Sequence, residues 1–143
     1  MEEDIRKIIE KSLRALESSE REIESGNYDF GCSRAFFAAL YMVKGILIVD
    51  QNDKKNLAEL FGLFKKNYID TQIFSEEIYR NLSNLVARRE AAEFAFTQRI
   101  TKRMADSCLL QAQNINKNLT RYLLKKLYEN IEPVPDDFEL EEF

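Results

Sequence analysis

Hydrophobic residues recur along much of the chain at the three- and four-residue spacing of α-helices. Between residues 3 and 25, isoleucines and leucines form one apolar stripe, and most other positions are polar or charged. Gly26 and Asn27 follow this stripe and are suited to end a helix, because both residue types tolerate turn conformations. The pattern therefore predicts an amphipathic first helix over residues 3–25.

The next segment, roughly residues 28–50, is apolar on almost all sides. A helix of this kind is surrounded by protein, so it is predicted to be the central helix of a bundle or to be covered on a second face by a dimer partner. The polar stretch DQNDKKN then predicts a loop. A shorter helix is predicted at about residues 55–67, with its apolar side chains on one face.

Two further helices complete the predicted bundle. Ser75 is a suitable N-cap for a fourth helix that runs from residue 76 to about 93, and Thr97 for a fifth that continues to about residue 130. The chain has only four glycines and two prolines, which favours long helices. We therefore predict an all-α fold, an antiparallel up-and-down bundle of about five helices, in one domain over residues 1–131.

The last twelve residues, EPVPDDFELEEF, hold six acidic residues and no basic one. Without them the chain has 21 basic and 19 acidic residues, so the predicted bundle lacks the strong basic charge of many nucleic-acid-binding domains. Residues 132–143 allow two interpretations. They form a flexible, solubilising tail, or they are a docking peptide whose aromatic residues enter a groove while its acids meet arginines.

Other sequence features narrow the class of protein. The longest apolar run, AFFAALYMVKGILIV, is interrupted by Lys44 and is shorter than the roughly 18–20 residues of a membrane span. The charged beginning of the chain lacks the apolar core of a signal peptide, so we expect a cytoplasmic protein that does not cross a membrane. Cys32 and Cys108 are isolated and are predicted to be buried, reduced thiols. Neither a glycine-rich phosphate loop nor a His/Cys cluster occurs, so no cofactor or metal is predicted.

Three stretches carry a resemblance to a known family: SGNYDFGCSRAFFAALYMVKGILI, KKNLAELFGLFKKNYIDTQIF and ARREAAEFAF. In this order and spacing they resemble the HEPN domain, in particular the members with a RAYYA motif, which reads RAFFA here. The resemblance covers about residues 10–115. It implies a five-helix, mostly antiparallel bundle that often dimerises.

The resemblance also implies a range of functions. Many HEPN proteins are metal-independent endoribonucleases or are paired with small nucleotidyltransferases in toxin–antitoxin operons. The ribonuclease members carry an arginine followed, after four to six residues, by a histidine. Arg89 aligns with that arginine, whereas Phe94 stands where the histidine would be.

Loss of the histidine changes the expected chemistry. Metal-free RNA cleavage needs a group that takes the proton of the attacking 2′-hydroxyl, and this chain contains no histidine at any position. Phe94 cannot transfer a proton. The sequence therefore favours a catalytically degenerate binding module, acting through a homodimer, a nucleotidyltransferase partner, or a bound nucleotide or RNA. A ribonuclease toxin with a non-histidine active site and a purely structural interaction bundle are the alternatives.

The predicted phosphate- or nucleotide-binding site comprises four residues with charged side chains and three supporting aromatic residues: Arg34, Arg88, Arg89 and Glu93, with Phe37, Tyr41 and Phe94. Convergence of the arginines would create a cationic pocket for phosphate, and the rings would offer stacking surfaces for a base. The competing interpretation is structural. Arg89 and Glu93 are four residues apart and would form an ion pair, Arg34 would pair with Glu93, and the aromatic side chains would pack in the core.

Overall fold

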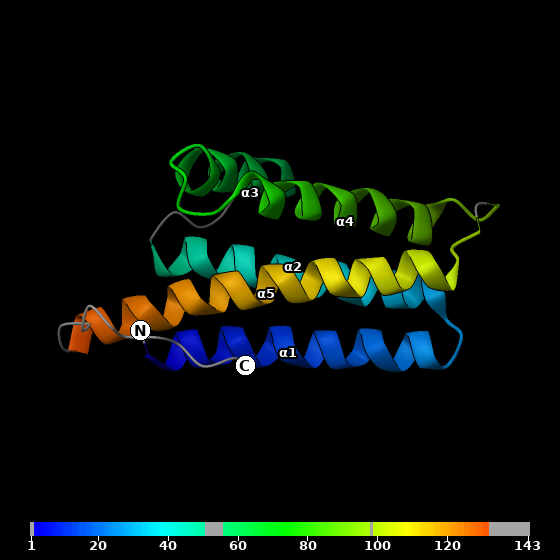
Figure 1. Cartoon of the computed structure of the whole chain (residues 1–143), viewed down its shortest axis with the longest axis horizontal. Helices are drawn as coiled ribbons and strands as arrows, with labels where there is room; N and C mark the ends of the chain where they lie inside the picture. Colours follow the sequence, from blue (N-terminus) through cyan, green and yellow to red (C-terminus); the bar gives the residue numbers. More distant parts are fainter. Residues whose placement is uncertain (1, 51–55, 98, 132–143) are drawn as a thin grey trace.

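The computed structural model describes residues 2–50, 56–97 and 99–131, which form a bundle of helices (Figure 1). The predicted tail, residues 132–143, lies outside this part of the chain. The described helices are, in chain order, α1 (Glu2–Glu24), α2 (Tyr28–Val49), α3 (Leu57–Phe64), the π-helical turn η1 (Lys65–Ile69), α4 (Glu76–Phe94) and α5 (Lys102–Ile131). The all-α bundle predicted from the sequence is confirmed.

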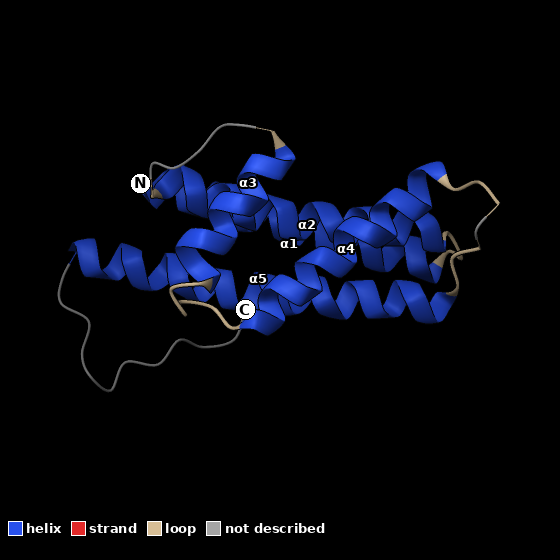
Figure 2. Ribbon diagram, turned by 90° about the horizontal axis from the view of Figure 1, so that it is seen from above, coloured by secondary structure: helices blue, strands red, loops and turns tan. Residues whose placement is uncertain are grey.

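The helices form three layers around α2. In Figure 1, α2 and α5 run through the middle, α1 lies along one side of them, and α3 and α4 lie along the other. The view from above shows the same elongated bundle, with α3 near one end of α4 (Figure 2). Helix α2 packs against α1, α3, α4 and α5 of its own chain, so these helices provide much of the cover that its apolar sequence requires.

Helix α1 ends as its sequence predicts. Gly26 has a φ of 84°, the left-handed region that an L side chain rarely adopts. The N–H of Gly26 donates to the carbonyl of Ile23, and the N–H of Asn27 donates to the carbonyl of Glu22. This pair of hydrogen bonds is a Schellman motif, which satisfies the last carbonyls of the helix and turns the chain toward α2.

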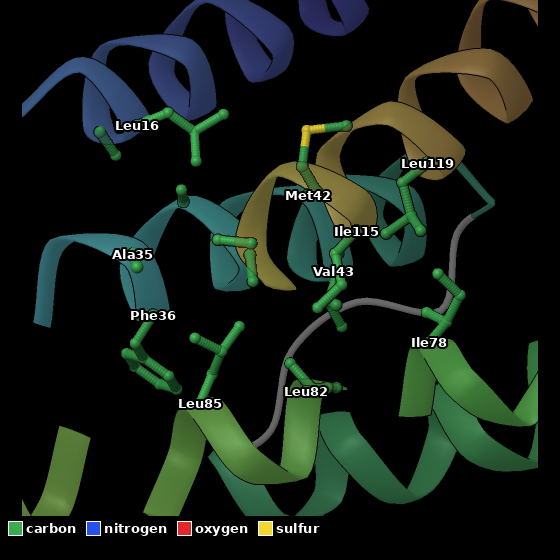
Figure 3. Packing of buried hydrophobic residues seen from close by; sticks show 14 of the residues in the cluster. Leu16, Ala35, Phe36, Met42, Val43, Ile78, Leu82, Leu85, Ile115 and Leu119 are labelled. Carbon is green, nitrogen blue, oxygen red and sulfur yellow. The ribbon is translucent and has the colours of Figure 1, made fainter. Parts of the chain in front are cut away.

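The hydrophobic core lies where the three layers meet. Figure 3 shows Leu16 of α1 above α2, and Leu82 and Leu85 of α4 below it. Met42 and Val43 of α2 lie between these layers, and both are fully buried. By length and composition α2 could also span a membrane, but 61% of its most apolar stretch is buried inside the bundle. This burial is typical of a core helix.

Glycines let α1 approach α2 closely. A Cβ atom at Gly45 would lie 2.5 Å from Cγ2 of Ile8, and one at Gly31 would lie 2.6 Å from Cγ1 of Ile23. This close approach lets two buried serines of α1 donate hydrogen bonds to carbonyls of α2. The hydroxyl of Ser12 donates to the carbonyl of Ala38 at 2.8 Å, and that of Ser19 to the carbonyl of Gly31 at 2.7 Å. Because buried polar groups are costly when unpaired, these bonds help to fix the alignment of the two helices.

A second polar cluster joins the end of α2 to η1 and α5. The carboxylate of Asp50, whose side chain is 11% exposed, accepts hydrogen bonds from the hydroxyls of Tyr68 and, at 2.7 Å, Tyr122. Its other oxygen pairs with the ammonium group of Lys126. Burial, followed by the charge of Glu129, raises the pKa of Tyr122. This cluster lies near the end of the bundle at which α2 finishes.

Two helix boundaries differ from those predicted. The third helical segment continues through η1 to Ile69, where the aromatic rings of Phe64, Tyr68 and Phe74 stack on one another and stabilise the extra turn. The fifth helix begins at Lys102 instead of following Thr97. The hydroxyl of Thr101 accepts a hydrogen bond from the N–H of Met104, as an N-cap side chain does.

Candidate functional site

One side of α2 stays partly open between α1 and α4. We call this side the open stripe; it consists of Arg34, Phe37, Tyr41, Lys44 and Ile48, which follow each other at helical spacing. From α1, the ammonium group of Lys11 lies 4.9 Å from the centre of the Tyr41 ring. From α4, the guanidinium carbon of Arg89 lies 5.6 Å from the centre of the Phe37 ring. Cations from two helices therefore cover the aromatic part of the stripe.

Arg89 is held by aromatic rings. Its guanidinium carbon lies 5.4 Å from the ring centre of Phe36 and 5.9 Å from that of Phe94, in addition to its contact with Phe37. Its Nε atom is buried and has no hydrogen-bond partner within the described ranges. The three rings attract the cation through their negative faces, but they cannot accept the N–H bonds as a carboxylate or a phosphate would.

Glu93 makes a contact other than the ion pairs of the competing structural interpretation. Its Oε1 accepts a hydrogen bond of 2.6 Å from the hydroxyl of Ser33 on α2. Among the described side chains, the ion pairs include neither Arg89 with Glu93 nor Arg34 with Glu93. The structural interpretation of these arginines as partners of Glu93 therefore finds no support in the geometry.

Arg88 turns away from Arg89, because adjacent residues of a helix point about 100° apart. It lies near the buried thiols of Cys32 and Cys108 and influences both. A hydrogen bond with Cys108, together with the charge of Arg88, lowers the pKa of Cys32, against the opposing effect of burial. The same hydrogen bond and burial raise the pKa of Cys108. Both cysteines are free and buried, as the sequence predicted.

Arg34 is exposed and lines a shallow hollow of about 220 Å³ between α1 and α2. Lys11 and Arg14 of α1 line the same hollow, as do Phe37 and Tyr41 of the open stripe. The hollow therefore combines three cations with two aromatic rings. Phe37 also lies beneath Arg89, so one ring borders the surroundings of both arginines.

The geometry brings some of the predicted site residues together and separates others. Arg34, Phe37 and Tyr41 share the hollow, and Arg89 and Phe94 meet nearby. Arg88 instead lies on a different side of α4, from which its charge influences the two cysteines. Sequence analysis missed Lys11 and Arg14, although their three-residue spacing places both on one side of α1. Helical periodicity alone did not indicate which helix that side would face.

Two exposed aromatic residues lie at the end of α4. Phe94, the last residue of this helix, is 67% exposed, and Phe96 is 92% exposed. Large apolar side chains in water often mark a surface that another molecule covers. Within the described ranges, no group of three or more metal-ligating side chains is gathered at this surface or elsewhere.

Comparison with known proteins identifies the family. The HEPN domain profile matches residues 5–129, which is most of the chain. The chain belongs to the HEPN domain family. A protein of Methanocaldococcus jannaschii named putative toxin MJ0142 is 28% identical over 123 residues, which make up 86% of this chain and 84% of that relative. The family predicted from the three sequence stretches is thereby confirmed, while the RAYYA subfamily stays a prediction.

The position of Phe94 gives the HEPN comparison a physical meaning. In this HEPN protein the ring of Phe94, at the position where the resemblance led us to expect a histidine, contributes to the aromatic surroundings of Arg89. A phenyl ring can stabilise the nearby cation, but it can neither accept nor donate a proton. The chain thus has an arginine at position 89 and a phenylalanine, which has no ionisable group, at position 94.

Proposed function

We propose that this HEPN protein is a catalytically degenerate binding module that holds a phosphate-bearing ligand, a nucleotide or RNA, between Arg34 of the open stripe and Arg89 of α4. The observation that carries the proposal is Arg89, whose Nε has no hydrogen-bond partner in the described chain while aromatic rings surround its guanidinium group. An arginine without a carboxylate partner is suited to receive a phosphate, because its planar fork matches phosphate oxygens.

The hollow beside Arg34 supports the same function. Its three cations supply positive charge for a second phosphate, and Phe37 and Tyr41 offer faces on which a base stacks. Stacking needs no particular base, so we expect binding with little sequence preference. Binding should also weaken as salt is added, because neutralising phosphates releases bound counterions.

The experiment is titration of a short, fluorescein-labelled single-stranded RNA with the full chain in EDTA, followed by fluorescence anisotropy. Arg89→Ala and Arg34→Ala should each weaken binding about tenfold, which corresponds to roughly 1.4 kcal/mol for one lost phosphate contact. Arg80→Ala is the matched control, because Arg80 is an exposed arginine of the same helix, α4. It changes the net charge equally and should leave the affinity unchanged.

Each other outcome has a distinct meaning. Cleavage of the RNA in EDTA that is lost in Arg89→Ala would contradict the proposal and establish the endoribonuclease alternative. Binding that weakens equally in Arg80→Ala would show attraction to overall charge and would contradict a defined site. If a folded chain binds none of RNA, AMP and ATP, the proposal is contradicted, and the alternative of a purely structural interaction bundle is favoured. Circular dichroism of each variant checks that the fold is intact.

We also propose that the protein acts as a cytoplasmic homodimer and pairs with a small nucleotidyltransferase in a toxin–antitoxin-like system. The name of the archaeal relative supports the toxin-like context. The exposed rings of Phe94 and Phe96 support an interface at the end of α4. Sedimentation of the unsubstituted chain should show a dimer at micromolar concentration. The double variant Phe94→Ser, Phe96→Ser should sediment as a monomer. A monomeric unsubstituted chain would contradict this part of the proposal.

A further inference from the structure

A second hollow includes part of the open stripe and is more apolar than the hollow at Arg34. It occupies about 350 Å³ between α1 and α2, and the two hollows share Lys11, Phe37 and Tyr41. Its floor is apolar and includes Ile8 and Ile48, whereas Lys7, Lys11 and Lys44 stand along it. We call this hollow the lysine groove.

The lysine groove is suited to an acidic peptide that carries apolar anchors. Its size is that of a typical small-ligand site, large enough for one or two aromatic side chains. Each of its three lysines is exposed, and within the described chain only Lys7 has an ion-pair partner, Glu3 at 3.9 Å. An occupant should therefore present apolar residues to the floor and carboxylates to the lysines.

The chain itself contains a segment with this composition. Residues 132–143 carry six carboxylates and no basic residue, with Phe138, Leu140 and Phe143 interspersed among the acids. This segment continues from α5, which ends at Ile131. Figure 1 shows the end of α5 at the same end of the bundle as the beginning of α1 and the end of α2, which both line the lysine groove. Twelve residues reach roughly 40 Å when extended.

We propose that residues 132–143 dock into the lysine groove of their own chain, with Phe138 and Phe143 on the apolar floor and the acids beside Lys7, Lys11 and Lys44. Attachment to α5 makes the contact intramolecular, which raises the effective concentration of the segment to about the millimolar range. Exposed ion pairs contribute only about 0.2–1 kcal/mol each, so the apolar anchors supply most of the stabilisation.

A carbodiimide that joins carboxylates directly to amines tests the proposal, because it needs no ligand and is independent of the proposed function. The full chain is cross-linked at low concentration, as an equal mixture of unlabelled and ¹⁵N-labelled protein, and its peptides are identified by mass spectrometry. We expect the acids of 132–143 to be joined to Lys7, Lys11 and Lys44 within one chain. The control is Lys66, an exposed lysine of η1 outside the groove. Equal cross-linking to Lys66 would overturn the proposal.

Two further readouts separate docking from other contacts. Phe138→Ser with Phe143→Ser keeps every charge but removes both anchors, and should lower the yield of groove cross-links about tenfold or more, given the free energy of burying an aromatic side chain. An unchanged yield would show attraction by charge alone and would overturn docking in the groove. Cross-links that join labelled to unlabelled peptides would show that the segment occupies the groove of a second copy, which would overturn the intramolecular arrangement.

Discussion

Replacing Gly45 by alanine tests how tightly α1 and α2 pack. The new Cβ atom would lie 2.5, 2.8 and 2.9 Å from Cγ2, Cδ1 and Cγ1 of Ile8. Because Cγ1 and Cγ2 are both attached to the Cβ of Ile8, the overlap can be relieved only by changing the Ile8 rotamer or by moving the helices apart. Overpacking of this kind costs about 1–3 kcal/mol.

The helix preference of alanine partly offsets the cost of this overpacking. Alanine in the interior of a helix is favoured over glycine by about 1 kcal/mol. Gly45→Ala should therefore change the free energy of unfolding by between about 0 and 2 kcal/mol, in the destabilising direction. Gly62 of α3 is the matched control, because a Cβ atom there would meet nothing within 4 Å. Gly62→Ala should stabilise the protein by up to about 1 kcal/mol.

The assay is urea-induced unfolding followed by far-ultraviolet circular dichroism, with the slope of the transition checked for constancy. A double-mutant cycle isolates the contact between the two residues. In the Ile8→Ala background, Gly45→Ala should become stabilising, as Gly62→Ala is, because the overlapping atoms are gone. The reasoning fails if Gly45→Ala stabilises the unsubstituted chain as much as Gly62→Ala does, or if Ile8→Ala leaves its effect unchanged.

Two further predictions concern the polar cluster at the end of α2. Asp50→Ala should lower the free energy of unfolding by about 3 kcal/mol, because two tyrosine hydroxyls and Lys126 lose a largely buried carboxylate. The control is Asp70→Ala, which breaks an exposed ion pair with Lys65 and should lower the free energy of unfolding by less than about 1 kcal/mol. Equal costs in urea unfolding would contradict the first prediction. Because the pKa of Tyr122 is raised by burial, the folded state keeps this proton above pH 10 while the unfolded state loses it, so stability falls as pH rises beyond about 10. Tyr122→Phe should make that alkaline loss shallower, and an unchanged pH dependence would contradict the second.

The sequence by itself determined the helices and the family. Apolar spacing located all five helices, because side chains that face a common core must recur with the period of the helix. Gly26 marked the end of α1 correctly, since its left-handed conformation is a local requirement. Local rules suffice wherever a few neighbouring residues decide the outcome.

Only the tertiary structure decided what these faces meet. Arg88 and Arg89 are adjacent in sequence, yet one lies near two buried thiols and the other above aromatic rings, because packing determines which side of α4 faces α2. Lys11 of α1 joined the site only because close packing against α2 carries it beside Tyr41. The partners of Asp50 come from distant parts of the chain, so no local pattern could have predicted them. Whether a charged side chain is paired, surrounded by aromatic rings or exposed depends on which helices pack together. That packing is determined jointly by all the side chains of the core.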